Sequence, residues 1–370
     1  MNFVHIVGNR PQFVKLALLY PELQHRAGGR SQIIHTGQHF DPDMSDIFFR
    51  QLGIPAPDHL LSIRNLSHND MIGNMLIGID RLFAVERPDA VVVYGDTNTT
   101  LAGALAAKKR NIPLAHIESG IRTGKEDMPE ESNRYLTDRM ADWNFACTAL
   151  GVENLIREGY GGPEAGPGAI RGGVFNSGDL MLDAALFFRE QALEQSAVLR
   201  DLRLEGLPFT LATIHRAENT DDQAALRTII GALNDLHHHT PVLFPMHPRT
   251  AQRIAKLGLQ VDFMTTPPLG YLDMLALVQS CRSVLTDSGG LSREAFFFRK
   301  PTLVVMRNPF WPEIFIHGNC LRADAAVEDI LAKQQVLLSG DKPFVTDVFG
   351  DGHAAVKISE ALIREVSANG

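Results

Sequence analysis

Short runs of consecutive apolar residues alternate with longer amphipathic segments along almost the whole chain. Such runs are typical of strands buried on both faces of a parallel sheet, and the amphipathic segments between them predict helices. The expected strands are 3–7, 31–35, 90–94, 113–117, 143–146, 209–214, 242–246, 261–264, 283–286 and 302–306. The expected helices are 100–110, 132–142, 149–157, 222–237 and 269–279. Strand–helix alternation in both halves predicts two doubly wound α/β domains.

One Gly/Pro-rich stretch, Gly159–Gly173, interrupts this alternation near the middle of the chain. Because so many glycines and prolines cannot hold a regular element, we place the domain boundary there. The expected domains are residues 1–172 and 173–353, with a C-terminal helix at about 354–370 that packs back on the first domain.

Composition narrows the class of protein mainly by exclusion. The 370 residues carry a net charge of −8, so no nucleic-acid partner is expected. No window approaches the ~20 apolar residues of a membrane span, and the chain begins directly with a predicted strand rather than a cleaved signal. The three cysteines, Cys147, Cys281 and Cys320, form neither a disulfide framework nor a zinc motif. We therefore expect a cytoplasmic enzyme.

Candidate binding residues follow the first predicted strand, at the sheet edge where open parallel sheets bind ligands. The segment VGNRPQFVK, Val7–Lys15, places Arg10 and Lys15 in the first turn of a helix. The dipole and unpaired N–H groups of that turn favour an anion. Two solvated cations explain the pattern about equally well. The segment is not GxGxxG, so no nicotinamide or flavin dinucleotide is expected.

Acidic residues follow the next two strands and open a helix. Asp96 lies in GDTNTT, Glu118 in HIESGIRT, and Glu130 and Glu131 in MPEESNR. Helix capping by Asp96 and macrodipole stabilisation by the two glutamates are the plain alternatives. Carboxylates that converge on one rim nevertheless favour acid–base chemistry, because neighbouring carboxylates separate their pKa values.

A histidine directly follows the first expected strand of the second half. His215 is followed by Arg216, Glu218 and Asn219, which can set its tautomer and hold a ligand. A structural histidine is the alternative. The motif is not HExxH, and the histidines 237–239 end a helix on its polar side, so no metal site is expected.

The segment TDSGGLSREA, Thr286–Ala295, carries the strongest phosphate pattern. Ser288, Gly289 and Gly290 open a helix directly after a strand, where glycines let N–H groups approach an anion closely. Glu294, one turn later, can accept both hydroxyls of a ribose. An ordinary Gly-rich turn is the weaker alternative, because both halves carry such patterns.

In their order and spacing, these motifs resemble the non-hydrolysing UDP-N-acetylglucosamine 2-epimerase family. The resemblance covers almost the whole chain and also includes HTGQH (His35–His39), HRAEN and MHPRT (Met246–Thr250). RPQFVK, GQHFDPDMSDIFF and IHRAENTDD are most similar to a branch acting on UDP-2,3-diacetamido-2,3-dideoxyglucuronate. The resemblance implies the GT-B fold, an α/β fold of two facing Rossmann-like domains with the active site in the cleft.

The resemblance also implies a role for each candidate residue. Glu131, which is adjacent to Glu130, is the alternative to Glu130 as a catalytic residue. No cofactor is implied, and the implied assembly is a homodimer. The implied catalytic residues are Asp96, Glu118, Glu130 and His215. The implied UDP-sugar-binding residues are Arg10, Lys15, Arg216, Asn219, His247, Ser288, Gly289, Gly290, Glu294 and Arg307.

The implied reaction inverts carbon 2 of UDP-N-acetylglucosamine to give UDP-N-acetylmannosamine. UDP leaves, an enzyme-bound glycal forms, and UDP adds back. The diacetamido-glucuronate is the alternative substrate, because the loop MRNPFWPE, Met306–Glu313, departs from the family pattern. Three other interpretations are less favoured: a hydrolysing epimerase, a GT-B glycosyltransferase and a nucleotide-sugar sensor. The glycosyltransferase and the sensor would leave the carboxylates unexplained.

Overall fold

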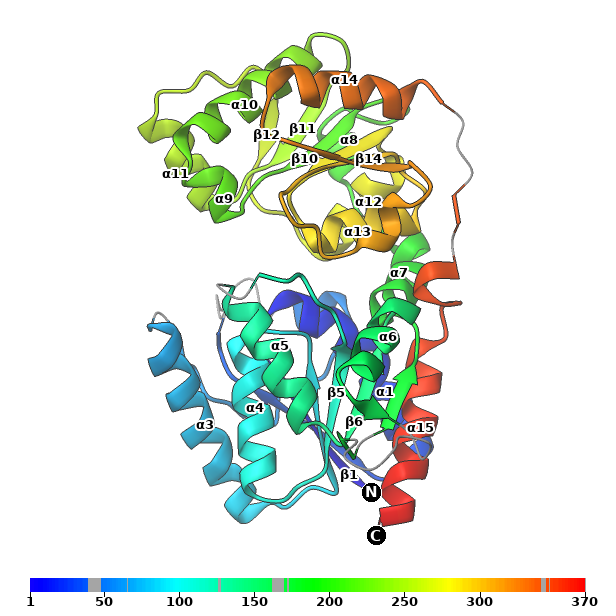
Figure 1. The fold of residues 1–370 in the computed structure, drawn as a ribbon. Coiled ribbons are helices and arrows are strands. Elements are labelled where there is room, and N and C mark those ends of the chain that lie inside the picture. Colours follow the sequence, from blue (N-terminus) through cyan, green and yellow to red (C-terminus); the bar gives the residue numbers. More distant parts are fainter. Residues whose placement is uncertain are drawn as a thin grey trace. The chain divides into compact units, whose positions relative to one another are not determined.

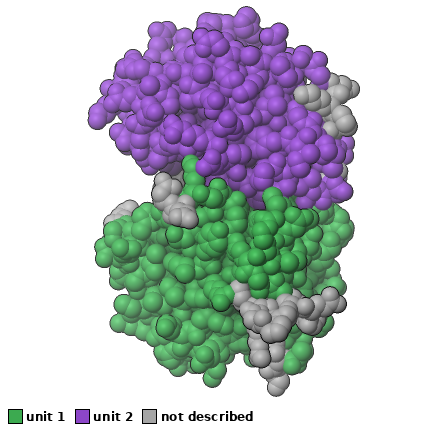
Figure 2. Space-filling view, in the orientation of Figure 1, with its two compact units in different colours: residues 1–184, 349–370 green, residues 185–348 purple. Residues whose placement is uncertain are grey.

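The computed structural model describes residues 1–38, 48–64, 66–125, 128–161, 170–171, 173–340, 344–345 and 347–369. Most of Gly37–Phe49 and most of Gly159–Gly173 lie outside these residues. The chain forms two compact units, residues 1–184 with 349–370 and residues 185–348. Figure 1 shows their elements and Figure 2 distinguishes the units by colour.

A parallel sheet of seven strands forms the centre of the first unit, in the order β3-β2-β1-β4-β5-β6-β9. Its middle strand β4 is a run of five fully buried apolar side chains, as expected where helices cover both faces of a sheet. The strands are β1 (Asn2–Val7), β2 (Arg30–His35), β3 (His59–Leu60), β4 (Ala90–Tyr94), β5 (Leu114–Ser119), β6 (Trp143–Ala146) and β9 (Gly173–Asn176). The helices are α1 (Arg10–Ala27), α3 (His68–Val85), α4 (Asn98–Lys109), α5 (Pro129–Met140), α6 (Ala149–Arg157) and α15 (Ala354–Asn369).

A second parallel sheet, in the order β12-β11-β10-β13-β14-β15, forms the centre of the other unit. Its apolar core packs under α10 and α14. The strands are β10 (Thr210–Thr213), β11 (Val242–Pro245), β12 (Met264–Thr266), β13 (Ser283–Thr286), β14 (Thr302–Val305) and β15 (Cys320–Ala323). The helices are α8 (Val198–Asp201), α9 (Ala217–Thr220), α10 (Gln223–His237), α11 (Pro248–Lys256), α12 (Tyr271–Ser280), α13 (Gly289–Phe297) and α14 (Val327–Leu338).

The two parallel sheets confirm the predicted α/β fold, but the units divide later than residue 172. The strand β9 pairs with β6 in the first sheet, so the segment after the Gly/Pro-rich stretch still belongs to the first unit. The chain leaves that unit within α7 (Leu180–Gln195) and returns at Phe349. After the return, α15 packs against α1 (Figure 1). None of the described helices combines the length and the apolar character needed to span a membrane.

Gly120 directly follows β5 and has a left-handed conformation against the first turn of α6. Its φ is 78°, and a Cβ there would lie 2.2 Å from the carbonyl oxygen of Gly151. We expect Gly120→Ala to lower the free energy of unfolding by about 3 kcal/mol, because backbone strain adds to a clash that only main-chain movement relieves.

Gly124→Ala is the matched control for this prediction. Gly124 also has a positive φ, 69°, but a Cβ there meets no atom within 4 Å. This variant should lose only about 1 kcal/mol, the strain term alone. Urea unfolding of both variants measures the difference. Equal losses would show that the approach of Gly120 to Gly151 does not constrain the fold.

Candidate active site

In the first sheet, the strands that follow β1 along the chain are added on one side of it as far as β3, and from β4 onward on the other side. The point between the parallel neighbours β1 and β4 is therefore the topological switch point of this sheet. Open parallel sheets bind ligands at such a point, beyond the carboxyl ends of the strands. Arg10 and Lys15 follow β1 in α1, Asp96 follows β4, and Glu118 lies at the end of β5. These four candidate residues therefore gather at one edge of the sheet.

Glu118 has an unusual backbone conformation and a buried cationic partner. Its φ is +70°, and the pairing of β5 with β6 shifts register around it, between Ile117 and Ser119. A register shift of this kind redirects a side chain near an active site. The carboxylate oxygen Oε2 lies 2.5 Å from the ammonium of Lys15, whose side chain is only 3% exposed. The structure thus places Lys15 on a candidate catalytic carboxylate.

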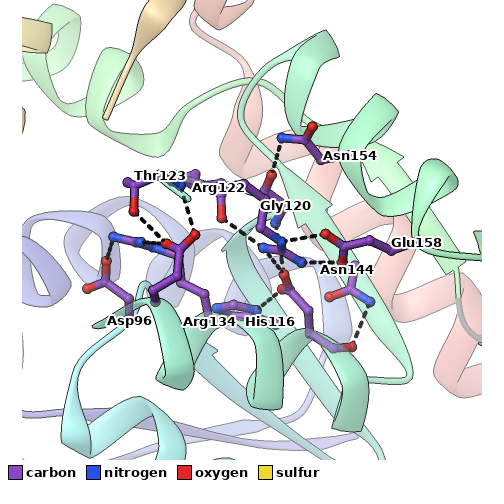
Figure 3. Close-up of polar contacts among 12 residues, drawn as sticks. Asp96, His116, Gly120, Arg122, Thr123, Arg134, Asn144, Asn154 and Glu158 are labelled. Atoms are coloured by element: carbon purple, nitrogen blue, oxygen red, sulfur yellow. Dashed lines mark hydrogen bonds and ion pairs between the residues drawn. The ribbon is translucent and has the colours of Figure 1, made fainter. Parts of the chain in front are cut away.

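Asp96 is held by a buried arginine that the sequence motifs did not single out. Arg134 of α5 contacts Asp96 Oδ2 at 2.5 Å and Glu131 Oε2 at 2.5 Å (Figure 3). Its side chain is only 1% exposed. Burial alone would lower the pKa of Arg134, but Asp96 and Glu131 raise it above its usual value. The spacing of three residues between Glu131 and Arg134, typical of an ion pair along one helix, is the sequence pattern that could have indicated it.

The two adjacent glutamates of α5 differ in their surroundings. Glu131 is buried and accepts hydrogen bonds from the backbone N–H groups of Thr123 and Gly124, at 2.8 and 3.1 Å. Burial alone would raise the pKa of Glu131, but these bonds and Arg134 lower it below its usual value. Glu130 is only half-buried. Glu131 therefore anchors Thr123 and Gly124, and Glu130 stays the candidate for acid–base chemistry.

The second sheet has its change of strand order between β10 and β13. His215 follows β10, and Asp287 follows β13. The carboxylate of Asp287 is fully buried and lies 3.1 Å from Nδ1 of His215. It also accepts hydrogen bonds from the backbone N–H groups of His215 and Arg216 and from the amide of Asn219.

Asp287 determines the tautomer of His215. Burial alone would raise the pKa of Asp287, but the hydrogen bonds from His215, Asn219 and Arg216 lower it below its usual value. The ionised carboxylate accepts the Nδ1 proton, which leaves Nε2 to exchange a proton with a ligand. The His215 side chain is 43% exposed, so this nitrogen can be reached. The sequence analysis expected Arg216, Glu218 and Asn219 to orient His215, and it missed Asp287. The pattern that could have indicated Asp287 is an acidic residue directly after a buried strand.

The Ser288-Gly289-Gly290 segment begins α13, and its two glycines differ. Ser288 Oγ caps the helix by accepting a hydrogen bond from the N–H of Leu291, at 3.2 Å. A Cβ on Gly289 would lie 2.9 Å from the ring of Phe310, so this glycine makes room for an aromatic side chain. A Cβ on Gly290 would approach only Ser288 Oγ, at 3.7 Å. Gly290 is therefore the one that leaves space for a ligand.

The remaining candidates lie around these two sheet edges. The Arg10 guanidinium lies 4.2 Å from the centre of the Phe48 ring, and that of Arg216 lies 4.5 Å from the Phe310 ring. Asn219 is buried and also donates to the carbonyl of Val305, at 2.9 Å. His247 is exposed and its Nδ1 caps α11; Arg307 is exposed and Glu294 is half-buried.

One group of possible metal ligands lies among the described residues. Donor atoms of Glu118, Cys147 and Asp179 lie within 4.8 Å of one another. The Lys15 ammonium lies 2.5 Å from the Glu118 carboxylate, and its positive charge would repel a metal cation bound there. We therefore assign no metal to this group.

Comparison with known proteins gives consistent matches over nearly the full length. The sequence profile described as UDP-N-acetylglucosamine 2-epimerase matches residues 21–363. A UDP-2,3-diacetamido-2,3-dideoxy-D-glucuronate 2-epimerase of Pseudomonas aeruginosa is 41% identical, over 98% of this chain and 100% of its own. A UDP-N-acetylglucosamine 2-epimerase homolog of Methanococcus maripaludis is 38% identical, over 98% and 99%. The crystal structure of the Methanocaldococcus jannaschii UDP-GlcNAc 2-epimerase with UDP-GlcNAc and UDP superposes with a TM-score of 0.89, at 32% identity, covering 98% of this chain and 100% of that one.

Proposed function

Because this chain belongs to the UDP-N-acetylglucosamine 2-epimerase family and is thus an isomerase, we propose that it inverts carbon 2 of a UDP-linked 2-acetamido sugar. UDP-N-acetylglucosamine is the first substrate, and UDP-N-acetylmannosamine is its product. The observation that carries the proposal is the placement of Asp96 and Glu118 at the carboxyl ends of the adjacent strands β4 and β5, each against a buried cation.

The carboxylates of the first unit supply the acid–base groups in this proposal. Epimerisation through a glycal needs one group to remove the proton on carbon 2 and another to return it from the opposite face. Asp96, Glu118 and Glu130 are the candidates. Arg134 and Lys15 hold two of these carboxylates in fixed positions, and such preorganisation favours proton transfer. Lys15 therefore acts through Glu118 in this proposal, rather than as a separate phosphate ligand.

The residues of the second unit bind the nucleotide and assist its departure. The N-terminus of α13 carries partial positive charge, and the N–H groups near Gly290 can donate to a diphosphate. Breaking the bond between carbon 1 and UDP develops negative charge on that diphosphate, which such donors stabilise. His215, oriented by Asp287, exchanges a proton through Nε2.

The second candidate substrate is UDP-2,3-diacetamido-2,3-dideoxyglucuronate, which the 41% identity to the Pseudomonas enzyme favours. Proton NMR can follow the carbon-2 epimer of each UDP-sugar and give kcat/KM for both. We expect turnover of at least one, with no acceptor sugar present and without accumulation of free UDP. Free UDP and free sugar would indicate a hydrolysing epimerase. Turnover only after addition of an acceptor would indicate a glycosyltransferase.

Gly290→Ala tests the nucleotide assignment with little effect on the fold. A Cβ fits at this position, and alanine within a helix is more favourable than glycine by roughly 1 kcal/mol. We expect the Kd for UDP to rise at least ~10-fold, about 1.4 kcal/mol, because the methyl group occupies the space through which the phosphates approach. Calorimetric titration with UDP measures the change.

Gly231→Ala, in the middle of α10, is the control for Gly290→Ala. A Cβ at Gly231 also meets no atom within 4 Å. This variant should bind UDP like the wild type. Unchanged UDP binding in Gly290→Ala would contradict the assignment of α13 to the phosphates.

We also propose a cytoplasmic location and a homodimer. Three buried free thiols, Cys147, Cys281 and Cys320, support a reducing compartment. Exposed apolar side chains on α3 and α5, among them Ile77 and Leu136, offer surface for a second copy. Light scattering of the purified protein measures the assembly directly.

A further inference from the structure

His116, a fully buried residue of β5, was not among the candidate residues (Figure 3). Its Nε2 lies 2.7 Å from the carbonyl oxygen of Gly95. A carbonyl oxygen can only accept a hydrogen bond, so Nε2 must carry a proton.

The other ring nitrogen of His116 faces a carboxylate. Nδ1 lies 2.6 Å from Asp138 Oδ1. The Arg122 guanidinium lies 2.8 Å from the other oxygen of Asp138, Oδ2, and the N–H of Gly120 also donates to it, so this carboxyl group is ionised and Oδ1 is an acceptor. Nδ1 must therefore donate as well. With both nitrogens donating, the ring is an imidazolium cation.

A chain of alternating charges makes this buried cation tolerable. Asp138 Oδ2 contacts the Arg122 guanidinium at 2.8 Å, and Arg122 contacts Glu158 through two bonds of 2.7 Å (Figure 3). Asp138 Oδ2 also accepts the N–H of Gly120, at 3.2 Å. The four side chains sum to zero net charge, and the buried carboxylate has donors on both oxygens, as buried ion pairs require.

The bond from His116 constrains the turn that carries Asp96. Gly95 has φ +64°, and its N–H donates to the carbonyl of Ile117 at 2.9 Å. Both polar groups of Gly95 are thus bound to β5. A Cβ on Gly95 would lie 3.8 Å from Lys15 Nζ and 3.9 Å from Glu118 Oε1, so this turn also borders the Lys15–Glu118 pair.

We propose that His116 is a positioning residue that Asp138 holds as an imidazolium. The bond from its Nε2–H to Gly95 fixes the turn that carries Asp96 and borders the Lys15–Glu118 pair. A neutral ring protonated on Nδ1 would direct a lone pair at the Gly95 carbonyl and repel it. The consequence for catalysis rests on the proposed epimerase function, whereas the charge on the ring does not.

Two amide substitutions separate positioning from a merely structural role. The His116→Gln amide can reach the position of Nε2 and keep the bond to Gly95. The shorter His116→Asn amide reaches only the position of Nδ1 and keeps the bond to Asp138. We expect His116→Asn to lower kcat about 100-fold, the usual effect of an ångström-scale misplacement, with the Kd for UDP unchanged. His116→Gln should keep most of the wild-type kcat. Equal kcat in the two variants, or the reverse order, would overturn the positioning role.

NMR of the ¹⁵N-histidine-labelled wild type at neutral pH tests the charge independently of activity. The His116 signals are those lost in His116→Gln. We expect a proton on both ring nitrogens of His116. His5, a buried histidine of β1, is the control. Its Nδ1 lies 2.6 Å from the Tyr94 hydroxyl, and burial lowers its pKa to about 3. The His5 ring should therefore carry one proton. An unprotonated nitrogen on His116 would overturn the imidazolium. Absence of epimerase activity in the wild type would refute the proposed function and leave this result standing.

Discussion

Asp96→Asn is expected to lower kcat for carbon-2 epimerisation by about 10²–10⁴-fold, the usual range for loss of an acid–base group. The asparagine oxygen can still accept a hydrogen bond from Arg134, now 2.5 Å from Asp96 Oδ2, and Glu131 still pairs with that arginine. The fold should therefore survive while proton transfer fails. Steady-state kinetics by NMR give kcat, and calorimetry should show unchanged UDP affinity.

Asp80→Asn is the control for this substitution. Asp80 is a carboxylate of α3 that is 42% exposed and pairs with Arg110 at 2.6 Å. Such surface pairs contribute little to stability, about 0–1 kcal/mol. Neither Asp80 nor Arg110 is among the candidate site residues. Its loss should leave kcat unchanged. A fully active Asp96→Asn variant would remove Asp96 from the reaction.

His215→Gln is the second substitution with a large expected effect. Glutamine cannot exchange a proton, so we expect kcat to fall about 10²–10⁴-fold with little change in UDP affinity. Asp287→Asn should act through the same step, because an amide nitrogen in place of a carboxylate oxygen disfavours the tautomer that leaves Nε2 to react.

The double variant His215→Gln/Asp287→Asn tests whether the two residues act as one unit. Once His215 is lost, its orienting carboxylate has nothing left to orient. We therefore expect the double variant to have the kcat of His215→Gln alone, measured beside thermal unfolding to confirm the fold. Losses in kcat that multiply would show that Asp287 acts independently of His215.

The central strands follow from the sequence pattern better than the edge strands do. The sequence predicts a strand over 90–94, and β4 has these bounds, because a strand covered on both faces is apolar throughout. The edge strand β12 begins at Met264 rather than at residue 261, and β15 is not predicted. An edge strand has one neighbour and less burial, so its pairing fixes its position more than its own pattern does.

Helix α4 shows how a local cap resolves an alternative left open by the sequence. The helix begins at Asn98 rather than at residue 100, because Thr97 and Thr100 form a reciprocal capping box. Thr97 therefore supplies the cap that the sequence also allowed for Asp96. The Asp96 carboxylate instead pairs with Arg134, at 2.5 Å.

The sequence indicates the candidate side chains for the reaction but not the residues that hold them. Asp96, Glu118 and His215 stand out because polar groups directly after buried strands are costly unless they are used. Arg134 lies 38 residues from Asp96, and Asp287 lies 72 residues from His215. Such contacts depend on which strands become neighbours, such as β10 and β13, and a single sequence does not give that order.

The most direct test of the central claim is proton NMR of UDP-N-acetylglucosamine incubated with the protein in heavy water. Elimination and re-addition of UDP remove the carbon-2 proton and return one from solvent. We predict that UDP-N-acetylmannosamine appears with deuterium at carbon 2, or that UDP-2,3-diacetamido-2,3-dideoxyglucuronate behaves in this way in its place. Inversion of carbon 2 without deuterium, or no exchange with either sugar, would contradict the account.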